Sequence, residues 1–270
     1  MYSFSATVYQ IPDTGNLAEI QAVLQNKSGP GANLPDPPFF HDSISNGAVA
    51  VERLAEHYGL RADPSLWATG FSDAKNLFGP GFEPGTNYAV AGAGAGNSGA
   101  GIDLPQQIGA FGSKFGGTAP TDAIYVVFIG GNDVRTAAHS DNQVLVSGGV
   151  AAEIAGVNAL LQAGAKRLLV VNVGDVGGIP EFAEQNPSQA ALATADSVLY
   201  DRLLAQGIDV LRQANVGVDL CLFDLFDFSA QVAADAASLG ITNTTDPCLN
   251  ADFTPGRQLL RSGHPHDQIR

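Results

Sequence analysis

The sequence is poor in the residues that define several common classes of protein. Its 270 residues include 2 cysteines, 1 methionine and 1 tryptophan, and only 15% of its side chains are charged. Two cysteines are too few for a disulfide framework, and Cys221 and Cys248 lack the paired spacing of a zinc site. Cys221 lies in the apolar run LCLF, where we expect a buried thiol. Cys248 is either free or bridged.

Basic side chains are also scarce. The chain carries 13 Lys and Arg against 27 Asp and Glu, which gives a formal net charge of −14. This charge repels phosphate backbones and anionic membrane surfaces, so we expect no nucleic-acid partner. No uninterrupted run of about 18 apolar residues predicts a transmembrane segment. The start MYSFSATVY has neither the basic region nor the apolar stretch of a signal peptide.

What the chain does have is enough apolar sequence, 45% of its residues, to bury a large core. Short runs of Val, Ile, Leu and aromatic residues alternate with stretches of helical spacing, a pattern typical of parallel strands joined by helices. We therefore predict one α/β domain over residues 1–270. The predicted strands cover residues 6–11, 88–91, 123–129, 167–173 and 216–223. The predicted helices cover a run at 49–58 capped by Ser45, and residues 150–162, 188–214 and 229–239.

In open parallel sheets, ligands bind beyond the carboxyl ends of the strands. The segments that follow the predicted strands are polar or rich in glycine: IPDTGN, GAGAGNSG, GGND, GDVGG and DLFD. In VVFIGGNDVR, two glycines let the backbone turn sharply and bring Asn132 to the end of a strand. An asparagine amide offers uncharged N–H donors that suit a developing oxyanion. An ordinary turn is the alternative interpretation of GGND.

Several separate blocks of the sequence favour the catalytic interpretation. They fall at strand ends or on connecting segments, over residues 13–254. The blocks are PDTGN (12–16), FHDSISNGAVAVERLAEHYGL (40–60), NYAVAGAGA (87–95), VVFIGGNDVR (126–135), LLVVNVGDVGGIPEF (168–182) and SLGITNTTDPCL (238–249). In order and spacing they resemble the secreted bacterial branch of the SGNH, or GDSL, esterases and lipases.

The resemblance implies a fold and an activity. The fold is a three-layer α/β/α sandwich with a central parallel sheet of the SGNH-hydrolase, flavodoxin-like type. The activity is hydrolysis of carboxylic esters of lipids, small acyl groups or acetylated sugars by serine acyl transfer, without a cofactor or metal. The oxyanion donors would be the backbone N–H of Gly92 and the side chain of Asn132, so we expect both to face one pocket. A secreted or periplasmic location is also implied.

The sequence departs from the family at two short windows. Where the family has Gly-Asp-Ser-Leu-Ser-Asp-Thr-Gly-Asn, residues 8–16 read VYQIPDTGN, so Gln10 occupies the nucleophile position. An amide cannot serve as that nucleophile. The family's Asp-x-x-His-Pro-Thr matches RSGHPH at residues 261–266, where His264 is the general base but Arg261 replaces the carboxylate that orients it. We expect a poorly anchored His264 and no closing helix.

Two explanations of these departures compete. The chain is either a relative that binds an ester or glycan ligand without cutting it, or a product of small frame shifts that altered residues 8–12 and 255–270. The sequence between the two windows follows the family, which favours frame shifts, because drift after loss of function would have spread over the whole site.

For the other motifs, a structural interpretation is preferred to a functional one. Gly94, Gly96 and Gly99 match the G-x-G-x-x-G spacing of dinucleotide sites, but they follow the second predicted strand, and Pro105 interrupts any helix begun at the third glycine. A loosely packed rim is the preferred interpretation. His264, His266 and Asp267 could ligate zinc, although a solvated tail is favoured. Asp133 is expected to be a turn residue that pairs with Arg135, and His139 has no predicted partner.

Overall fold

The computed structural model describes residues 1–5, 48–60, 62, 65, 85–90, 92–96, 102–183 and 187–246. Its centre is a four-stranded parallel sheet in the order β1-β2-β3-β4. The strands are β1 (Tyr2–Ser5), β2 (Ile124–Phe128), β3 (Arg167–Val171) and β4 (Asp219–Phe223). The helices are α2 (Ala50–His57), α4 (Leu104–Lys114), α5 (Gly131–Ser140), α6 (Val144–Gln162), α7 (Pro180–Ala183), α8 (Pro187–Ala214) and α9 (Leu225–Ala234), with a 3-10 turn η3 (Val176–Gly178).

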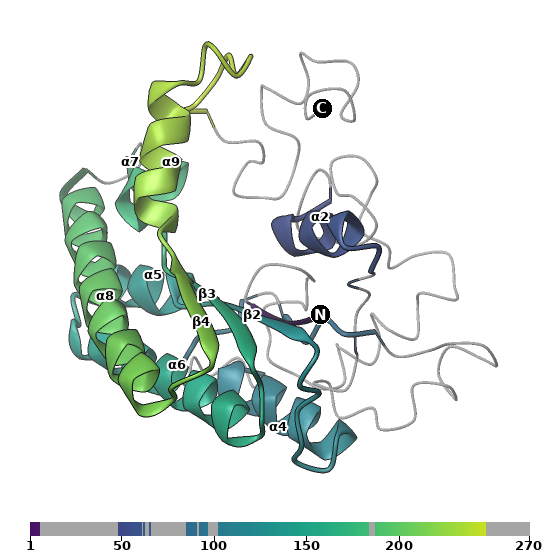
Figure 1. Cartoon of the computed structure of the whole chain (residues 1–270). Helices are drawn as coiled ribbons and strands as arrows, with labels where there is room; N and C mark the ends of the chain where they lie inside the picture. Colours follow the sequence, from purple (N-terminus) through teal and green to yellow (C-terminus); the bar gives the residue numbers. More distant parts are fainter. Residues whose placement is uncertain are drawn as a thin grey trace, which may run out of the picture.

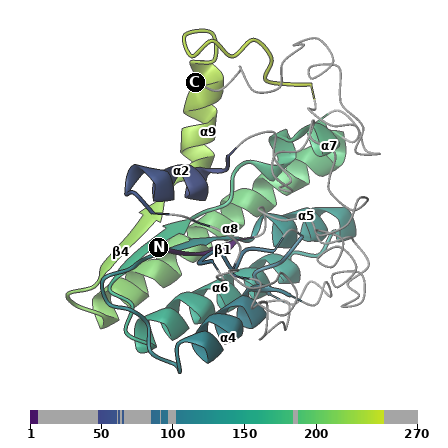
Figure 2. The ribbon, with the colours of Figure 1, turned by 90° about the vertical axis from the view of Figure 1, so that its right-hand side faces the viewer.

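The two faces of the sheet are buried against different helices, because successive side chains of a strand point to opposite faces. On one face, Tyr125 and Val127 of β2 join the large core that α4, α6 and α8 complete. On the other, Val126 packs with Ala55 of α2 in a smaller cluster. Figure 1 shows α2 on one side of the strands and α4, α6 and α8 on the other, and Figure 2 views the molecule from the α2 side. The predicted three-layer α/β/α fold is confirmed.

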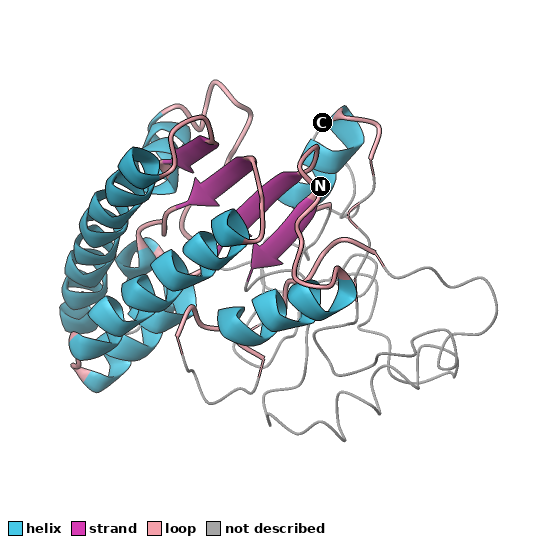
Figure 3. Ribbon diagram, turned by 60° about the horizontal axis from the view of Figure 1, so that its bottom comes forward, coloured by secondary structure: helices cyan, strands magenta, loops and turns pink. Residues whose placement is uncertain are grey.

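Helix α6 is long and apolar enough, by length and composition alone, to cross a membrane. Its neighbours show a different role, because it packs against α4, α5 and α8. It also carries the fully buried Glu153 in its middle. Figure 3 shows the long helices lined up beneath one face of the strands. We therefore interpret α6 as a core helix.

The structure agrees with most of the predicted elements and corrects one strand. Predicted strands at 123–129, 167–173 and 216–223 correspond to β2, β3 and β4. The predicted strand at 88–91 is wrong, because residues 88–90 lie in no strand. The reason is local: the Asn87 side chain accepts the Ala89 N–H at 3.1 Å, which removes a donor from any strand pairing there.

Smaller corrections concern the ends of elements. The chain forms β1 at Tyr2–Ser5, before the predicted strand at 6–11, which lies outside the described residues. Helix α2 agrees with the predicted run at 49–58, but its cap is Val49 and not Ser45, and the Glu52 carboxylate accepts the Val49 N–H at 2.9 Å. Helices α4, α5 and α7 were not predicted.

Cys221 corrects the expectation of a buried thiol, because the side chain is free and exposed on β4. Alternation along this short strand explains the error. Leu220 turns into the large core, so its neighbour Cys221 must face the opposite side of the sheet. An apolar run in the sequence does not reveal which face of a strand is covered, and in the described sheet only the Leu220 face of β4 packs into the large core.

Candidate active site at the carboxyl ends of the strands

The turn after β2 carries Asn132 into the first turn of α5. Gly130 is the residue before that helix and has a φ of 102°, a backbone conformation that glycine adopts without strain. The Gly130 carbonyl accepts the Val134 N–H at 3.0 Å and so starts the helix. The sequence GGND therefore forms a sharp strand-to-helix turn, with Asn132 and Asp133 held at the carboxyl end of β2.

The segment at residues 92–96, which we call the Gly92 loop, lies beside this turn. Asn132 Nδ2 donates to the Ala93 carbonyl at 2.9 Å, which ties α5 to the residue that follows Gly92. Gly92 itself has a φ of 79°. The structure thus brings together the two segments to which the family resemblance assigns the oxyanion donors. Asn132 and Ala93, which the bond joins, are 39 residues apart in the sequence.

Two carboxylates hold the backbone of the Gly92 loop. Asp103 accepts the Gly94 N–H at 2.7 Å. Asp133 accepts the Ala95 N–H at 2.7 Å and the Gly96 N–H at 3.1 Å. We call Asp103, Asp133 and these three amides the carboxylate clamp. Asp133 is therefore more than a turn residue, because it fixes a loop that is distant in the sequence.

Two donors remain available after these bonds are counted. Within the part of the chain that the structure describes, no hydrogen bond uses the Gly92 N–H, and this residue is exposed. An asparagine amide has two N–H donors, and among the described residues only one of those of Asn132 is used, by the Ala93 carbonyl. Fixed, uncharged donors of this kind stabilise an oxyanion that develops in a transition state.

Burial and hydrogen bonding have opposite effects on the pKa of Asp133 in the clamp. Burial raises the pKa of the Asp133 carboxyl, while the N–H groups of Ala95 and Gly96 act in the opposite direction. Asp103 lies near enough for its charge to raise the Asp133 pKa further. The ionised clamp therefore depends on the backbone donors that it holds in place.

The carboxyl ends of β3 and β4 are joined by Asn172. Its Oδ1 accepts the Leu225 N–H at 2.6 Å, and its Nδ2 donates to Asp224 Oδ1 at 3.1 Å. Asp224 also accepts the Asp227 N–H at 3.0 Å and so caps α9. Asn172 is only 5% exposed, so its satisfied amide is best explained as structural.

Helix α8 supports the loop that follows β3. Asp201 accepts the Val173 N–H at 3.0 Å, and Ser197 Oγ accepts the Val176 N–H at 3.2 Å. Thr194 Oγ1 donates to Asp175 at 2.6 Å. Burial raises the pKa of Asp201 to about 7. The GDVGG motif is thereby fixed against a helix by polar side chains.

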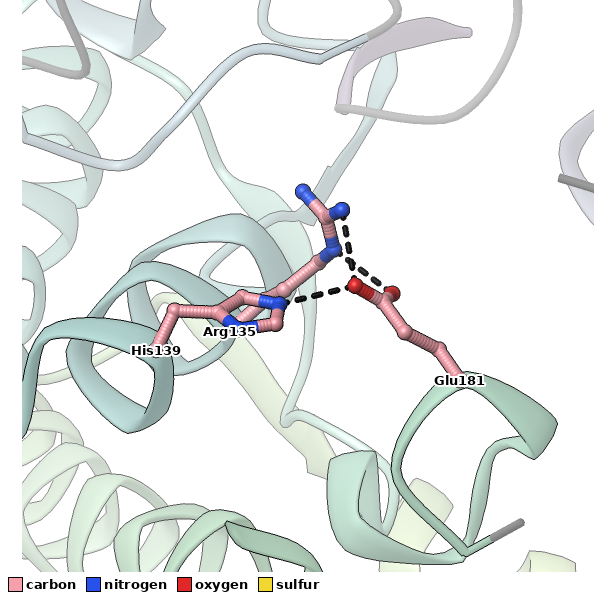
Figure 4. A network of polar contacts seen from close by, with 3 residues as sticks. All are labelled: Arg135, His139 and Glu181. Carbon is pink, nitrogen blue, oxygen red and sulfur yellow. Dashed lines mark hydrogen bonds and ion pairs between the residues drawn. The ribbon is translucent and has the colours of Figure 1, made fainter. Parts of the chain in front are cut away.

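A polar network joins α5 to α7 at the surface (Figure 4). Arg135 donates to both carboxylate oxygens of Glu181, from Nε at 2.7 Å and from a terminal nitrogen at 2.8 Å. His139 Nε2 lies 2.8 Å from the same carboxylate. The Arg135 hydrogen bonds lower the pKa of Glu181. The expected pairing of Arg135 with Asp133 is therefore wrong, and His139 has a partner that the sequence did not indicate.

Several sequence-predicted site residues cannot be placed. Gln10, Arg261 and His264 lie outside the described residues, as do His266 and Asp267. Their roles stay predictions. Gly94 and Gly96 belong to the carboxylate clamp, and α4 begins at Leu104 with Pro105 in its first turn.

The sequence patterns do not indicate Asp103 or Glu181, nor Glu153 and Tyr200, which form a buried hydrogen-bonded pair between α6 and α8. A signal existed for Asp103, because an aspartate followed at once by Leu and Pro is a common start of a helix. The others lie far in the sequence from the residues that they contact, so no local pattern marks them.

Comparison with known protein families identifies the family of the chain. The chain matches the model of the GDSL-like lipase/acylhydrolase family over residues 11–265 and therefore belongs to that family. Ester hydrolysis is the general activity that this membership supports. No match was found among curated proteins.

Proposed function

We propose that the site is that of a carboxylic ester hydrolase working by serine acyl transfer, in which Gly92 and Asn132 are the oxyanion donors. The observation that carries the proposal is the bond from Asn132 Nδ2 to the Ala93 carbonyl at 2.9 Å, which fixes the Asn132 amide beside the exposed residue Gly92. His264 is assigned as general base by its match to the family block. The substrate is a small-molecule or lipid ester, and a secreted or periplasmic location is part of the proposal.

The reaction requires a hydroxyl at the position of Gln10. In the family, that hydroxyl adds to the acyl carbon and gives its proton to the histidine, while the carbonyl oxygen becomes an oxyanion bound by the donors. Collapse of the intermediate expels the alcohol, which takes the proton from the histidine, and water then releases the acid. With Gln10 in place, the donors remain but the acyl-enzyme cannot form.

Binding without hydrolysis is the second candidate function. It is favoured by two residues, because Gln10 replaces the nucleophile and Arg261 replaces the carboxylate that orients His264. The intact turn at Asn132 and the carboxylate clamp would then serve to bind an ester or glycan ligand. The two candidates differ in a single measurable property, which is turnover.

The test compares the chain as written with two altered versions, using a short chromogenic ester. The first version carries Gln10→Ser alone. The second restores the family block at residues 8–12 and adds Arg261→Asp. We expect turnover near background for the chain as written, because donors and binding alone leave only about 10³- to 10⁴-fold over water.

The pattern of recovery decides between the candidates. Because residues of a catalytic unit act together, Gln10→Ser alone should recover little and the full restoration much more. No recovery after full restoration would favour binding without hydrolysis. Strong activity of the chain as written that survives Gln10→Ala would place the nucleophile elsewhere and refute the alignment of the first block.

A further inference from the structure

A buried carboxylic acid and a buried phenol face each other between α6 and α8. Glu153 and Tyr200 are both 0% exposed. Tyr200 Oη donates to Glu153 Oε2 at 2.7 Å, while Glu153 Oε1 is buried and has no hydrogen-bond partner. An apolar side chain would fill this place without the cost of burying a carboxyl group. The pair therefore calls for a role beyond packing.

The phenol lies directly against the turn that presents Asn132. A Cβ atom on Gly130 would stand 2.5 Å from the Tyr200 oxygen, so the backbone of Gly130 rests on the end of the ring. Gly130 precedes α5 and is two residues before Asn132. The position of the Asn132 donor thus depends on where the Tyr200 ring is held, and Glu153 is its hydrogen-bond partner.

The same face of α6 contacts the carboxylate clamp. Gly149 lies one turn before Glu153, and a Cβ atom at Gly149 would stand 2.8 Å from Asp133 Oδ1. The Asp133 carboxylate therefore occupies the space that this glycine leaves. Gly149 and Glu153 are neighbours along one face of α6; Gly149 adjoins Asp133, and Glu153 bonds to the Tyr200 ring that supports Gly130.

Among the described residues, the charged groups that act on Glu153 are acids. Asp133 of α5 and Asp201 of α8 act on it through their charges, and Tyr200 supplies its hydrogen bond. Helix α6 has no other ionisable side chain, and α4 presents Leu104 to it at Gly156. Burial, the largest cause, raises the pKa of Glu153 to about 8. Below that pH the protonated acid adds no charge beside Asp133.

We propose that Glu153 and Tyr200 are a positioning pair for the oxyanion donors, in which protonated Glu153 holds the ring beneath Gly130 and ionised Glu153 repels Asp133 and loosens the carboxylate clamp. The oxyanion role of the donors rests on the proposed function. The mechanical link from Glu153 to the Gly92 loop does not, because it follows from the contacts of Tyr200 and Asp133. The oxyanion donors would then lose their fixed position at alkaline pH because Glu153 ionises in the core, and not because His264 titrates.

The test follows backbone amides in the full chain as written, so it needs no turnover. The ¹⁵N and ¹H chemical shifts of the Ala95 and Gly96 amides are recorded by NMR from about pH 5 to about pH 10. We expect both amides to show one alkaline titration step. In Glu153→Gln, which cannot ionise, that step should be lost, whereas in the control Asp201→Asn it should remain.

Amide hydrogen exchange tests the positioning itself. Above the step, we expect protection of the Ala95 and Gly96 amides to fall by about tenfold in the unaltered chain, because the clamp opens locally. In Glu153→Gln, protection should be independent of pH, since glutamine can still accept the Tyr200 hydrogen bond. In Glu153→Leu, which cannot, protection should be low at every pH, while amides of β3 stay protected.

The outcomes separate this inference from the proposed function. A titration step at Ala95 and Gly96 that persists in Glu153→Gln would overturn the inference, since another group would then be its source. Equal protection in Glu153→Leu and Glu153→Gln would also overturn it, because the Tyr200 hydrogen bond would then be irrelevant to the loop. Loss of the step in Glu153→Gln, combined with no ester turnover after full restoration, would support the pair and refute the proposed function.

Discussion

Replacing Glu153 by glutamine should change the pH dependence of stability in a calculable direction. Burial raises the pKa of this carboxyl from 4.5 to about 8 in the folded chain. A carboxyl whose folded pKa is raised contributes stability that is fully present below pH 4.5 and is lost as the pH rises through about 8. Glutamine is neutral at every pH and cannot show this loss. The variant should therefore gain stability relative to the unaltered chain as the pH rises.

The size of the effect follows from the burial of Glu153. Each pKa unit corresponds to about 1.4 kcal/mol, so the ceiling is about 5 kcal/mol between the acidic and alkaline limits. Relaxation of the site lowers such values, and we expect about 2 to 3 kcal/mol. At acidic pH the variant should be about 1 kcal/mol less stable, because one buried amide N–H lacks an acceptor.

The assay is urea denaturation followed by circular dichroism at about pH 5 and about pH 9, with the free energy of unfolding of both proteins compared at each pH. Acids that do not interact with Glu153 contribute equally to both proteins and cancel in the difference. The matched control is Glu56→Gln, because the Glu56 side chain is 72% exposed on α2. For that control, the difference in unfolding free energy from the unaltered chain should change by less than about 0.5 kcal/mol between the two pH values. A difference for Glu153→Gln that does not vary with pH would refute the reasoning.

Three further predictions concern the site and its surroundings. Gly130→Ala should cost more than about 3 kcal/mol of unfolding free energy, because the added Cβ would meet the buried Tyr200 ring at a residue with a φ of 102°. Denaturation compares it with Gly148→Ala, which has open space around it and should be neutral or slightly stabilising. Asp133→Asn should increase amide exchange in the Gly92 loop, because one amide oxygen cannot replace two carboxylate acceptors; unchanged exchange would contradict the clamp. Arg135→Gln should cost no more than about 1 kcal/mol at neutral pH, because the pair is partly exposed. That cost should vanish as the pH falls through the lowered pKa of Glu181, and denaturation at acidic and neutral pH checks this.

Features with a regular pattern could be predicted from the sequence. The runs that became β2, β3 and β4 are short, apolar and rich in β-branched residues, and helix α8 has a clear helical period. The turn at Asn132 was also found, because two glycines between an apolar strand and a polar pair leave few alternatives. These are local signals that survive in a single sequence.

The parts that failed depend on distant contacts. The stretch at 88–91 looks like a strand, yet the Asn87 side chain takes the Ala89 amide that a strand would pair. Helix α5 was missed because Gly131 and Asn132 at its start favour turns, and packing against α6 and α8 decides its conformation. The contact of Tyr200 with Gly130 joins α8 to a turn 70 positions earlier in the chain, and no periodicity records it.

The proposed function requires Asn132 to act as an oxyanion donor, and one substitution tests this role most directly. In the version restored at residues 8–12 and at Arg261, kcat for a short chromogenic ester is compared with and without Asn132→Ala. We predict that kcat falls by about 10²- to 10³-fold while KM changes little, because the donor acts on the transition state and not on the bound substrate. Global stability of the two proteins, measured in parallel, excludes unfolding as the cause. An unchanged kcat in a folded Asn132→Ala protein would contradict the oxyanion role of Asn132.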